Sequence, residues 1–178
     1  MEKTELKEDI KIKIPIIHES AFIADGARII GDVTLMQYSS IWYNTVARAD
    51  INKIVVGERS NVQDNSVIHL ENDQGVTIGN DVTIGHNAII HGCTISDGAL
   101  IGMGAIIMNG AVIGNGAVVG AGAVVKENMI VRPFELIVGV PGKAVKILPD
   151  TVLSQNIDWA GKYVKLAKLH KANQKLKK

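Results

Sequence analysis

The chain has 178 residues, a formal net charge of +1 and 47% hydrophobic residues, which suits a single soluble domain. The near-neutral charge argues against a nucleic-acid partner, and the basic end KLHKANQKLKK is typical of a solvated helix end. No run approaches the ~20 apolar residues of a membrane helix, so we do not expect a membrane partner.

The start of the chain, MEKTELKEDIKIKIP, mixes acids and lysines and lacks an apolar stretch of signal-peptide length. The sequence has one cysteine, Cys93, so no disulfide can form within the chain and a reducing environment suits it. We expect a small buried thiol at Cys93 rather than a metal ligand. These features predict a cytoplasmic protein.

A repeat of six residues dominates the chain from Ile23 to Ile130. Its clearest hexads follow Ile95 and read ISDGAL, IGMGAI, IMNGAV, IGNGAV and VGAGAV. The first place is nearly always Ile, Val or Leu, and the fifth is usually Ala, Ser, Thr or Val. A helix does not explain this period, because 3.6 residues per turn would carry the large apolar side chains around its surface.

A coiled parallel β-structure explains the period of six. Each hexad supplies a short strand and a turn, its first and fifth residues point inward, and rungs pair ~4.8 Å apart. Residues 12–142 resemble the hexapeptide-repeat superfamily, whose fold is a left-handed parallel β-helix with three hexads in each triangular coil. This winding is an exception to the right-handed crossover rule. We therefore predict an all-β, left-handed parallel β-helix domain over residues 1–148.

The end of the chain changes to a helical pattern, and the segment VPGKAVKILPD supplies breakers before it. Apolar residues recur at helical spacing between residues 149 and 170, at Leu153, Ile157, Ala160, Val164 and Ala167. We predict a C-terminal α-helix within residues 149–178 that packs along the prism.

Three hexads in each coil assign every hexad to one of three faces. The hexad at Ala47 is assigned to face one. The next three hexads begin at Val56, Val62 and Ile68 and fall on faces two, three and one. The following three begin at Ile78, Ile84 and Ile90 and repeat that order. The frame gains three residues after the hexad at 47, gains four after the hexad at 68, and loses one after the hexad at 90. All three irregularities fall at the corner between faces one and two.

Two columns of polar side chains follow from this count. Arg48, His69 and His91 hold the second place of face-one hexads, so we expect them to stack outward, one rung apart. Asp64 and His86 hold the third place of face-three hexads and form another column. The histidines of the first column and the two residues of the second are each separated by 22 residues. This interval is one coil of three hexads plus the four-residue insertion.

The two columns predict a metal site shared between chains. His69 and His91 can converge on one ion from successive rungs, whereas His86 lies on another face and has to come from a neighbouring subunit. Three-fold packing, with face-one columns against face-three columns, would assemble the three histidines in a homotrimer. Three imidazoles with an open fourth position are the arrangement of catalytic zinc, and imidazole ligation also suits Fe²⁺, Co²⁺ and Ni²⁺.

Three motifs carry a closer resemblance: RAD at residues 48–50, NVQDNSVIH at residues 61–69 and GHNAIIHGC at residues 85–93. They resemble the γ-class carbonic anhydrases and their close relatives. The resemblance implies metal-dependent, reversible hydration of carbon dioxide to bicarbonate, with the same three histidines as ligands and one of them from the neighbouring chain.

The resemblance also implies roles beside the metal. Arg48, Asp50 and Asp64 match an ionic network between subunits, and Gln63 matches a residue that orients hydroxide or bicarbonate. Tyr163, on the predicted helix, resembles a tyrosine that relatives bring near the site. A guanidinium can hold two carboxylates at once, and an amide can both donate and accept hydrogen bonds.

Several of these roles have alternatives. Arg48 with Asp50 is consistent with a structural bridge between subunits as well as with a catalytic contribution. Packing alone would also explain Tyr163. The remaining histidines, His18 and His170, are expected to be solvated.

The sequence departs from the archaeal members of the γ class, which carry glutamates that shuttle protons. Ile51 follows Asp50, and the loop LENDQGVT after His69 offers only Glu71 and Asp73. Slow proton export is therefore expected.

Two functions of other classes compete with carbon dioxide hydration. A hexapeptide-repeat acyltransferase would share the coil and use an acyl-thioester donor, but a single general base does not need three histidines at metal spacing. The other is a non-catalytic subunit for metal binding or assembly.

Overall fold

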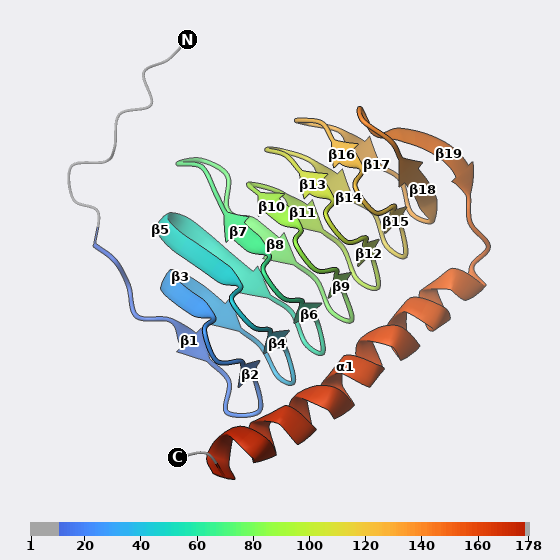
Figure 1. Ribbon diagram of the computed structural model, residues 1–178. Helices are drawn as coiled ribbons and strands as arrows, with labels where there is room; N and C mark the ends of the chain where they lie inside the picture. Colours follow the sequence, from blue (N-terminus) through green and yellow to red (C-terminus); the bar gives the residue numbers. More distant parts are fainter. Residues whose placement is uncertain (1–10, 177–178) are drawn as a thin grey trace.

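The computed structural model describes residues 11–176 and shows a parallel β-solenoid of about seven turns with one long helix beside it (Figure 1). The predicted fold class is confirmed. Residues 1–10 of the predicted β-helix domain and residues 177–178 of the predicted helical segment lie outside the described residues.

The strands form the three predicted faces. Face one holds β7 (Val67–His69), β10 (Ile89–His91), β13 (Ile106–Ile107) and β16 (Val124–Val125). Face two holds β1 (Ile16–Ile17), β8 (Val76–Ile78), β11 (Thr94–Ile95), β14 (Val112–Ile113) and β17 (Ile130–Val131). Two longer strands, β3 (Arg28–Leu35) and β5 (Val46–Val56), continue from face one to face two and join them into one sheet.

Face three is a separate sheet that ends in the only antiparallel pair among the described strands. It holds β2 (Phe22–Ile23), β4 (Ser40–Ile41), β6 (Asn61–Val62), β9 (Thr83–Ile84), β12 (Leu100–Ile101), β15 (Val118–Val119), β18 (Glu135–Val138) and β19 (Lys143–Ile147). The sequence pattern predicted only breakers where β19 forms. This prediction was incomplete, because β19 turns back and pairs antiparallel with β18.

Strand register confirms the assignment of hexads to faces. Ala47 lies opposite Ile68 and Ile68 opposite Ile90 on face one, and Val62 lies opposite Ile84 on face three. All five side chains are 0% exposed, since successive residues of a strand point to opposite sides. Burying an aliphatic side chain of this size contributes roughly 1.5–3 kcal/mol. The hexad repeat therefore builds one continuous core.

The three frame irregularities lie at the corner between faces one and two, as predicted. The first becomes part of the continuous strand β5. The second forms the loop of residues 70–75 between β7 and β8, on the upper edge of the solenoid in Figure 1. The third leaves a tight turn at Gly92, where φ is +48°. This corner carries the least regular backbone next to the face-one histidine column.

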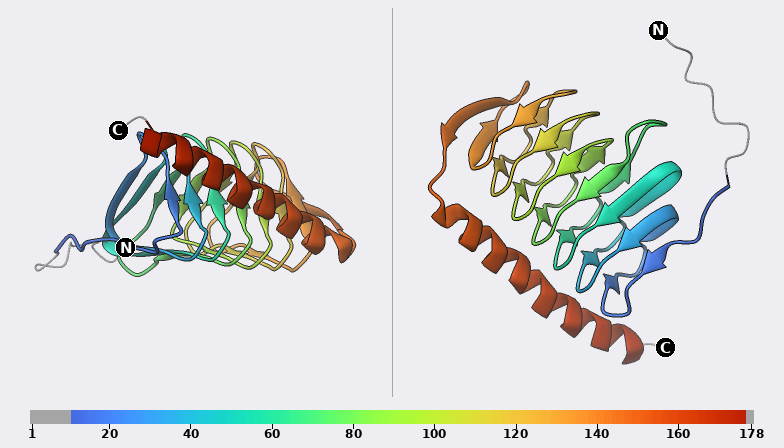
Figure 2. Two further views of the ribbon diagram at one scale, coloured as in Figure 1. Left: turned by 90° about the horizontal axis from the view of Figure 1, so that it is seen from below. Right: turned by 180° about the vertical axis from the view of Figure 1, so that it is seen from behind.

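Helix α1 (Thr151–Leu176) runs along face three over β2, β4, β6 and β9, and its last turns lie near β2 (Figure 2). Ala160 and Ala167 are buried as predicted, but Ile157 is 39% exposed. Asn156 is also buried, and its Nδ2 donates to the Gly98 carbonyl oxygen at 2.9 Å. Ile157 still contacts the prism, since its Cγ1 lies 3.9 Å from the position of a Cβ on Gly98. Apolar spacing did not register Asn156, an amide that satisfies a buried carbonyl. Within the described residues, no helix has the length and apolarity to cross a membrane.

An aromatic cluster fastens the end of α1 to the first coils. His170 lies 5.1 Å from Trp42 between ring centroids, and its Nδ1 is 2.7 Å from the Tyr43 hydroxyl. Phe22 and Tyr163 also pack against Trp42. The expectation that His170 is solvated was wrong, whereas His18 is exposed. Helix docking thus holds the corner between faces three and one, where Tyr43 lies.

Candidate metal centre

The predicted stacking of His69 and His91 is observed. The two residues lie directly opposite each other in the pair β7 and β10. Their ring centroids are 5.1 Å apart, and His69 Nδ1 lies 3.0 Å from His91 Nε2. Parallel pairing with outward side chains at this register brings the two imidazoles together.

Arg48 and Asp50 extend the column from β5. Asp50 Oδ1 lies 3.3 Å from His69 Nε2, and Asp50 Oδ2 pairs with Arg48 Nη1. Burial acts to raise the pKa of Asp50, but the hydrogen bonds from Arg48 and His69 outweigh it and hold the pKa below its ordinary value. Burial and the charge of Arg48 lower the pKa of His69, which favours the neutral imidazole that binds metals.

Asn109 holds the other side of the pair. Its Oδ1 contacts His91 Nδ1, and its Nδ2 donates to Glu71 Oε1 at 3.4 Å. Sequence reasoning missed Asn109. The hexad count could have found it, because IMNGAV begins at Ile107 on face one and places Asn109 beside the histidine column.

The donors and acceptors around the two imidazoles fit a bound cation. The Asp50 carboxylate and the Asn109 carbonyl can only accept, so His69 carries its proton on Nε2 and His91 carries its proton on Nδ1. These tautomers are assigned from hydrogen-bond partners. Both facing nitrogens are then lone-pair acceptors only 3.0 Å apart, close to the about 3.3 Å between two nitrogens on one tetrahedral zinc ion. The facing nitrogens fit a shared metal ion.

Asp64 and His86 form the second predicted column, at the corner between faces three and one. Asp64 Oδ2 lies 2.7 Å from His86 Nδ1, and Asp64 Oδ1 accepts from the Tyr43 backbone N–H at 3.2 Å. Within residues 11–176, no three His, Cys, Asp or Glu side chains gather as a single-chain metal site. One chain therefore presents a histidine pair and a separate third histidine.

Gln63 and Tyr163 lie with the second column. Gln63 is 4% exposed and its Nε2 donates to Asn61 Oδ1 at 3.1 Å. Burial raises the pKa of Tyr163, and the negative charge of Asp64 adds to the effect. Tyr163 also packs edge-to-face on Trp42 with ring centroids 5.4 Å apart. The structure thus divides the predicted site residues between two corners of the prism.

Other candidates near the histidine pair take different positions. Cys93 is 3% exposed, and burial raises the pKa of its thiol to about 12. Metal ligation requires the thiolate, which this environment disfavours. Asp73 is exposed on the loop, while Glu71 is engaged with Asn109.

Comparisons with known proteins identify the family. Residues 92–127 match the family model "Bacterial transferase hexapeptide (six repeats)". A Methanocaldococcus jannaschii protein named "Probable carbonic anhydrase" is 45% identical over 152 residues, which cover 85% of this chain and 96% of that protein. The mitochondrial γ carbonic anhydrase 1 of Arabidopsis thaliana is 48% identical over 58 residues, 33% of this chain and 21% of its own length.

Among solved structures, a Bacillus cereus protein provisionally named an acetyltransferase superposes with a TM-score of 0.86 at 40% identity, covering 89% of this chain and 92% of that chain. Identity of 45% over 85% of the chain shows the family to which the chain belongs. The chain belongs to the γ-class carbonic anhydrase-like family of the hexapeptide-repeat superfamily.

Proposed function

We propose that this protein catalyses the reversible hydration of carbon dioxide to bicarbonate, at metal sites shared between the subunits of a homotrimer. The observation that carries the proposal is the pair of facing acceptor nitrogens on His69 and His91, 3.0 Å apart. Such a pair can hold a cation between its lone pairs, and a third imidazole would complete the His₃ set of a catalytic zinc site.

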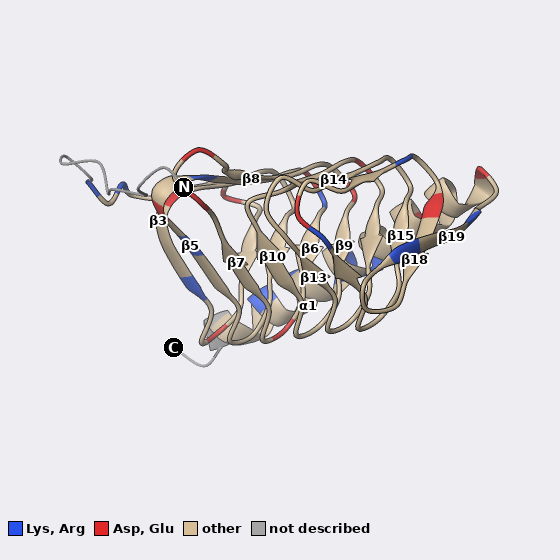
Figure 3. Ribbon diagram, turned by 90° about the horizontal axis from the view of Figure 1, so that it is seen from above, with Lys and Arg blue, Asp and Glu red and all other residues tan. Residues whose placement is uncertain are grey.

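The surface of face one supports a trimer. Its outward residues form an unbroken aliphatic ladder from rung to rung: Val46, Val67, Ile89, Ile106 and Val124. Val67 and Ile89 are 40% and 42% exposed, and strands β7, β10 and β13 carry no charged residue (Figure 3). A contiguous apolar surface of this kind suits burial against another protein surface. A second copy of the chain is the occupant we propose.

Three-fold packing on face one would also complete the site. Face one is bounded by the corner that carries His69 and His91 and by the corner that carries Asp64 and His86. A closed ring of three prisms would set one corner of each chain against the other corner of the next. Arg48 of one chain would then meet Asp64 of its neighbour.

In this proposal His69 and His91 of one chain and His86 of the next hold the metal. When bound, the metal lowers the pKa of a coordinated water to about 7 and so supplies a nucleophile at neutral pH. Zn²⁺ is our first assignment, with Fe²⁺, Co²⁺ and Ni²⁺ as alternatives that imidazole ligands also suit.

The chain's own residues would orient the reactants and handle the proton. Gln63 is held by Asn61 at 3.1 Å, and its remaining amide N–H and its carbonyl suit contacts to the attacking oxygen and to bicarbonate. Burial and the charge of Arg48 favour the neutral form of His69, and Asp50 holds it in one tautomer. Ile51 offers no proton acceptor, and Glu71 is engaged with Asn109. The proton therefore has to leave to water or buffer.

Metal analysis and rapid kinetics test the proposal. Protein purified without added metal should contain bound metal, and stopped-flow hydration should rise with the concentration of imidazole-type buffer at fixed ionic strength. Zinc protein and anaerobically prepared iron protein should be compared, because an iron site would be lost in air. Trimeric, metal-loaded forms that hydrate carbon dioxide no faster than buffer alone would refute the reaction.

The similarity to an acetyltransferase-named structure makes acyl transfer the second candidate. An acyltransferase would turn over an acyl-thioester after metal removal, whereas the proposed hydration would stop. A non-catalytic metal-binding or assembly subunit would bind metal and show neither activity. We also propose a cytoplasmic location, which the single buried thiol of Cys93 supports.

A further inference from the structure

The four-residue insertion after the hexad at 68 forms a loop that is anchored from two sides. Glu71 N–H donates to the Gln74 carbonyl at 3.0 Å, and Gln74 N–H donates to the Glu71 carbonyl at 3.3 Å. Asn52 Nδ2, from β5, donates to the carbonyls of Glu71 and Asn72 at 3.3 and 2.9 Å. The Glu71 side chain therefore starts from a backbone that is fixed on both sides.

This loop reaches the histidine pair through Asn109. A carboxylate can only accept hydrogen bonds, so Glu71 draws the NH₂ group of the Asn109 amide towards itself. The amide oxygen is then turned to His91 Nδ1, where it too can only accept. The proton of His91 is thereby held on Nδ1, and the lone pair of Nε2 faces His69.

The shortened corner after His91 makes room for this arrangement. A Cβ on Gly92 would lie 3.2 Å from Asn109 Oδ1 and 3.4 Å from Gln74 Cβ. Gly92 also has φ of +48°, a conformation that side chains other than glycine rarely adopt. The shortened corner after the hexad at 90 and the inserted loop after the hexad at 68 thus both lie against the side-chain amide of Asn109.

We propose that Glu71 and Asn109 are positioning residues that select the tautomer of His91 and so present its Nε2 to the metal. The inference rests on the proposed metal site. It gives the inserted loop a role in orienting a ligand, and it gives Glu71 a role other than proton transfer. Asp50 contacts His69 directly, whereas Glu71 acts on His91 through the side chain of Asn109.

The first measurement uses the metal-free protein, so that it does not depend on the reaction. Long-range ¹H–¹⁵N spectra of ¹⁵N-histidine protein should show His91 protonated on Nδ1. In Asn109→Ala the Nε2-protonated form should become populated. Asn115→Ala is the matched control, because Asn115 also precedes a positive-φ glycine in a turn but is exposed and away from the histidines. An Nε2-protonated His91 in the unaltered protein would overturn the inference.

The second measurement is Co²⁺ affinity by competition titration, with the cobalt absorption spectrum as a report of ligand geometry. Loss of a residue that orients a metal ligand typically weakens binding 10–100-fold, and we expect a loss of about this size in Asn109→Ala. Glu71→Ala should weaken Co²⁺ binding several-fold, because the side-chain amide of Asn109 is then free to rotate and exchange its oxygen and nitrogen positions. Asp73→Ala is its control, since it removes the same charge from the same loop at an exposed position.

A double variant separates orientation from simple packing. In the Glu71→Ala background, Asn109→Asp supplies a side chain whose two oxygens both accept, so the proton of His91 should return to Nδ1 and Co²⁺ affinity should recover to within about threefold of the unaltered protein. Unchanged affinity in Asn109→Ala, or no recovery in the double variant, would contradict the inference while leaving carbon dioxide hydration intact. Absence of carbon dioxide hydration with the predicted tautomer shifts would instead refute the proposed reaction alone.

Discussion

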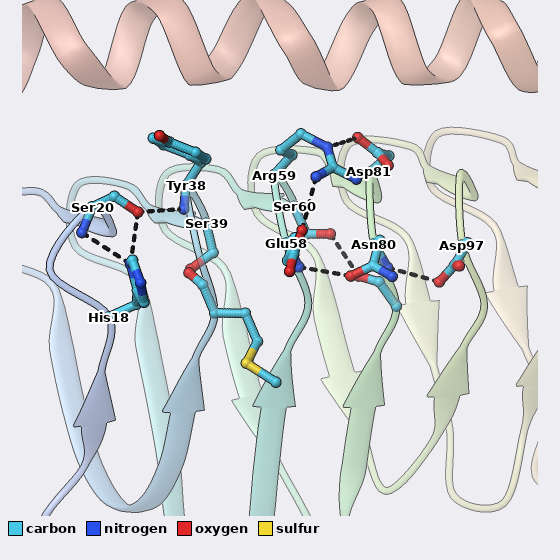
Figure 4. Close-up of polar contacts among 12 residues, drawn as sticks. His18, Ser20, Tyr38, Ser39, Glu58, Arg59, Ser60, Asn80, Asp81 and Asp97 are labelled. Atoms are coloured by element: carbon cyan, nitrogen blue, oxygen red, sulfur yellow. Dashed lines mark hydrogen bonds and ion pairs between the residues drawn. The ribbon is translucent and has the colours of Figure 1, made fainter.

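Two corners of the solenoid carry ladders of charged and polar side chains, and the ladders differ in how they end. At the corner between faces two and three, Arg59 donates to both oxygens of Asp81 at 2.7 Å and to Glu58 Oε2 at 2.9 Å (Figure 4). Asn80 Oδ1 accepts the Glu58 backbone N–H, and Asp97 Oδ1 accepts the Asn80 backbone N–H, both at 2.8 Å. Every charged group in this ladder has a hydrogen-bond partner within the chain.

At the corner between faces one and two, the ladder of Arg48, Asp50, His69 and His91 ends differently. Its hydrogen bonds leave two acceptor nitrogens facing each other. The difference suggests how a structural ladder can be separated from the proposed metal site. The first ladder matches its own donors to its own acceptors, whereas in the second the two facing acceptors suit a bound cation.

The largest expected effect comes from His86, the third proposed metal ligand, which lies outside the second ladder. His86→Ala should abolish metal binding and carbon dioxide hydration, because only two imidazoles remain at each site. The solenoid should stay folded, since His86 points outward from a turn. Metal content, sedimentation and circular dichroism check this, with the exposed His18→Ala as control. A monodisperse monomeric His86→Ala with stoichiometric metal would eliminate the shared site.

The next effect compares the arginines of the two ladders. Arg48→Ala should weaken trimers and abolish activity together, because two carboxylates, Asp50 and the neighbour's Asp64, lose their shared cation. Breaking such a pair in a buried interface typically costs ~3–5 kcal/mol. Sedimentation equilibrium and stopped-flow hydration measure the two losses. A stable trimer of Arg48→Ala with full activity would remove Arg48 from the site.

Arg59→Ala should lower the free energy of unfolding by about 1–2 kcal/mol and leave metal binding unchanged. The Arg59 side chain is 40% exposed and Asp81 is 13% exposed, so solvent screening reduces the value of the pair while its two parallel hydrogen bonds increase it. Urea denaturation and metal analysis measure the two quantities. Reduced metal binding in Arg59→Ala would show that the two ladders are not separate.

The smallest effect concerns a third ion pair within the chain, between Arg132 and Glu135. Burial acts to raise the pKa of Glu135, but the backbone and side-chain N–H groups of Arg132 outweigh it and hold the pKa below its ordinary value of 4.5. A carboxyl with a lowered folded-state pKa stabilises the fold above its ordinary pKa, and this contribution is lost as pH falls through the folded value.

Glu135→Gln should therefore be less stable than the unaltered protein at pH 7, by about 1 kcal/mol for charge-assisted hydrogen bonds. The difference should shrink below pH 4.5. Urea denaturation at several pH values measures it. A difference that is constant with pH would mean that Glu135 contributes by packing alone.

The sequence by itself determined the fold, the three faces and both polar columns. A strand sends successive side chains to opposite sides, and three hexads close one coil, so counting residues is enough to place His69 opposite His91 and Asp64 beside His86. The frame irregularities were also countable, which located the irregular corner before its shape was known.

Only the tertiary structure decided which side chains meet across loops and between the helix and the prism. Asn109 reaches His91, and Glu71 reaches Asn109, because an inserted loop folds back over a shortened corner. Likewise Asn156 bonds to Gly98 from the inner side of α1, and His170 joins the aromatic cluster. Periodicity specifies the direction of a side chain on a regular strand. Contacts made by loops and by the docked helix depend on distances between segments far apart in the chain, which periodicity does not contain.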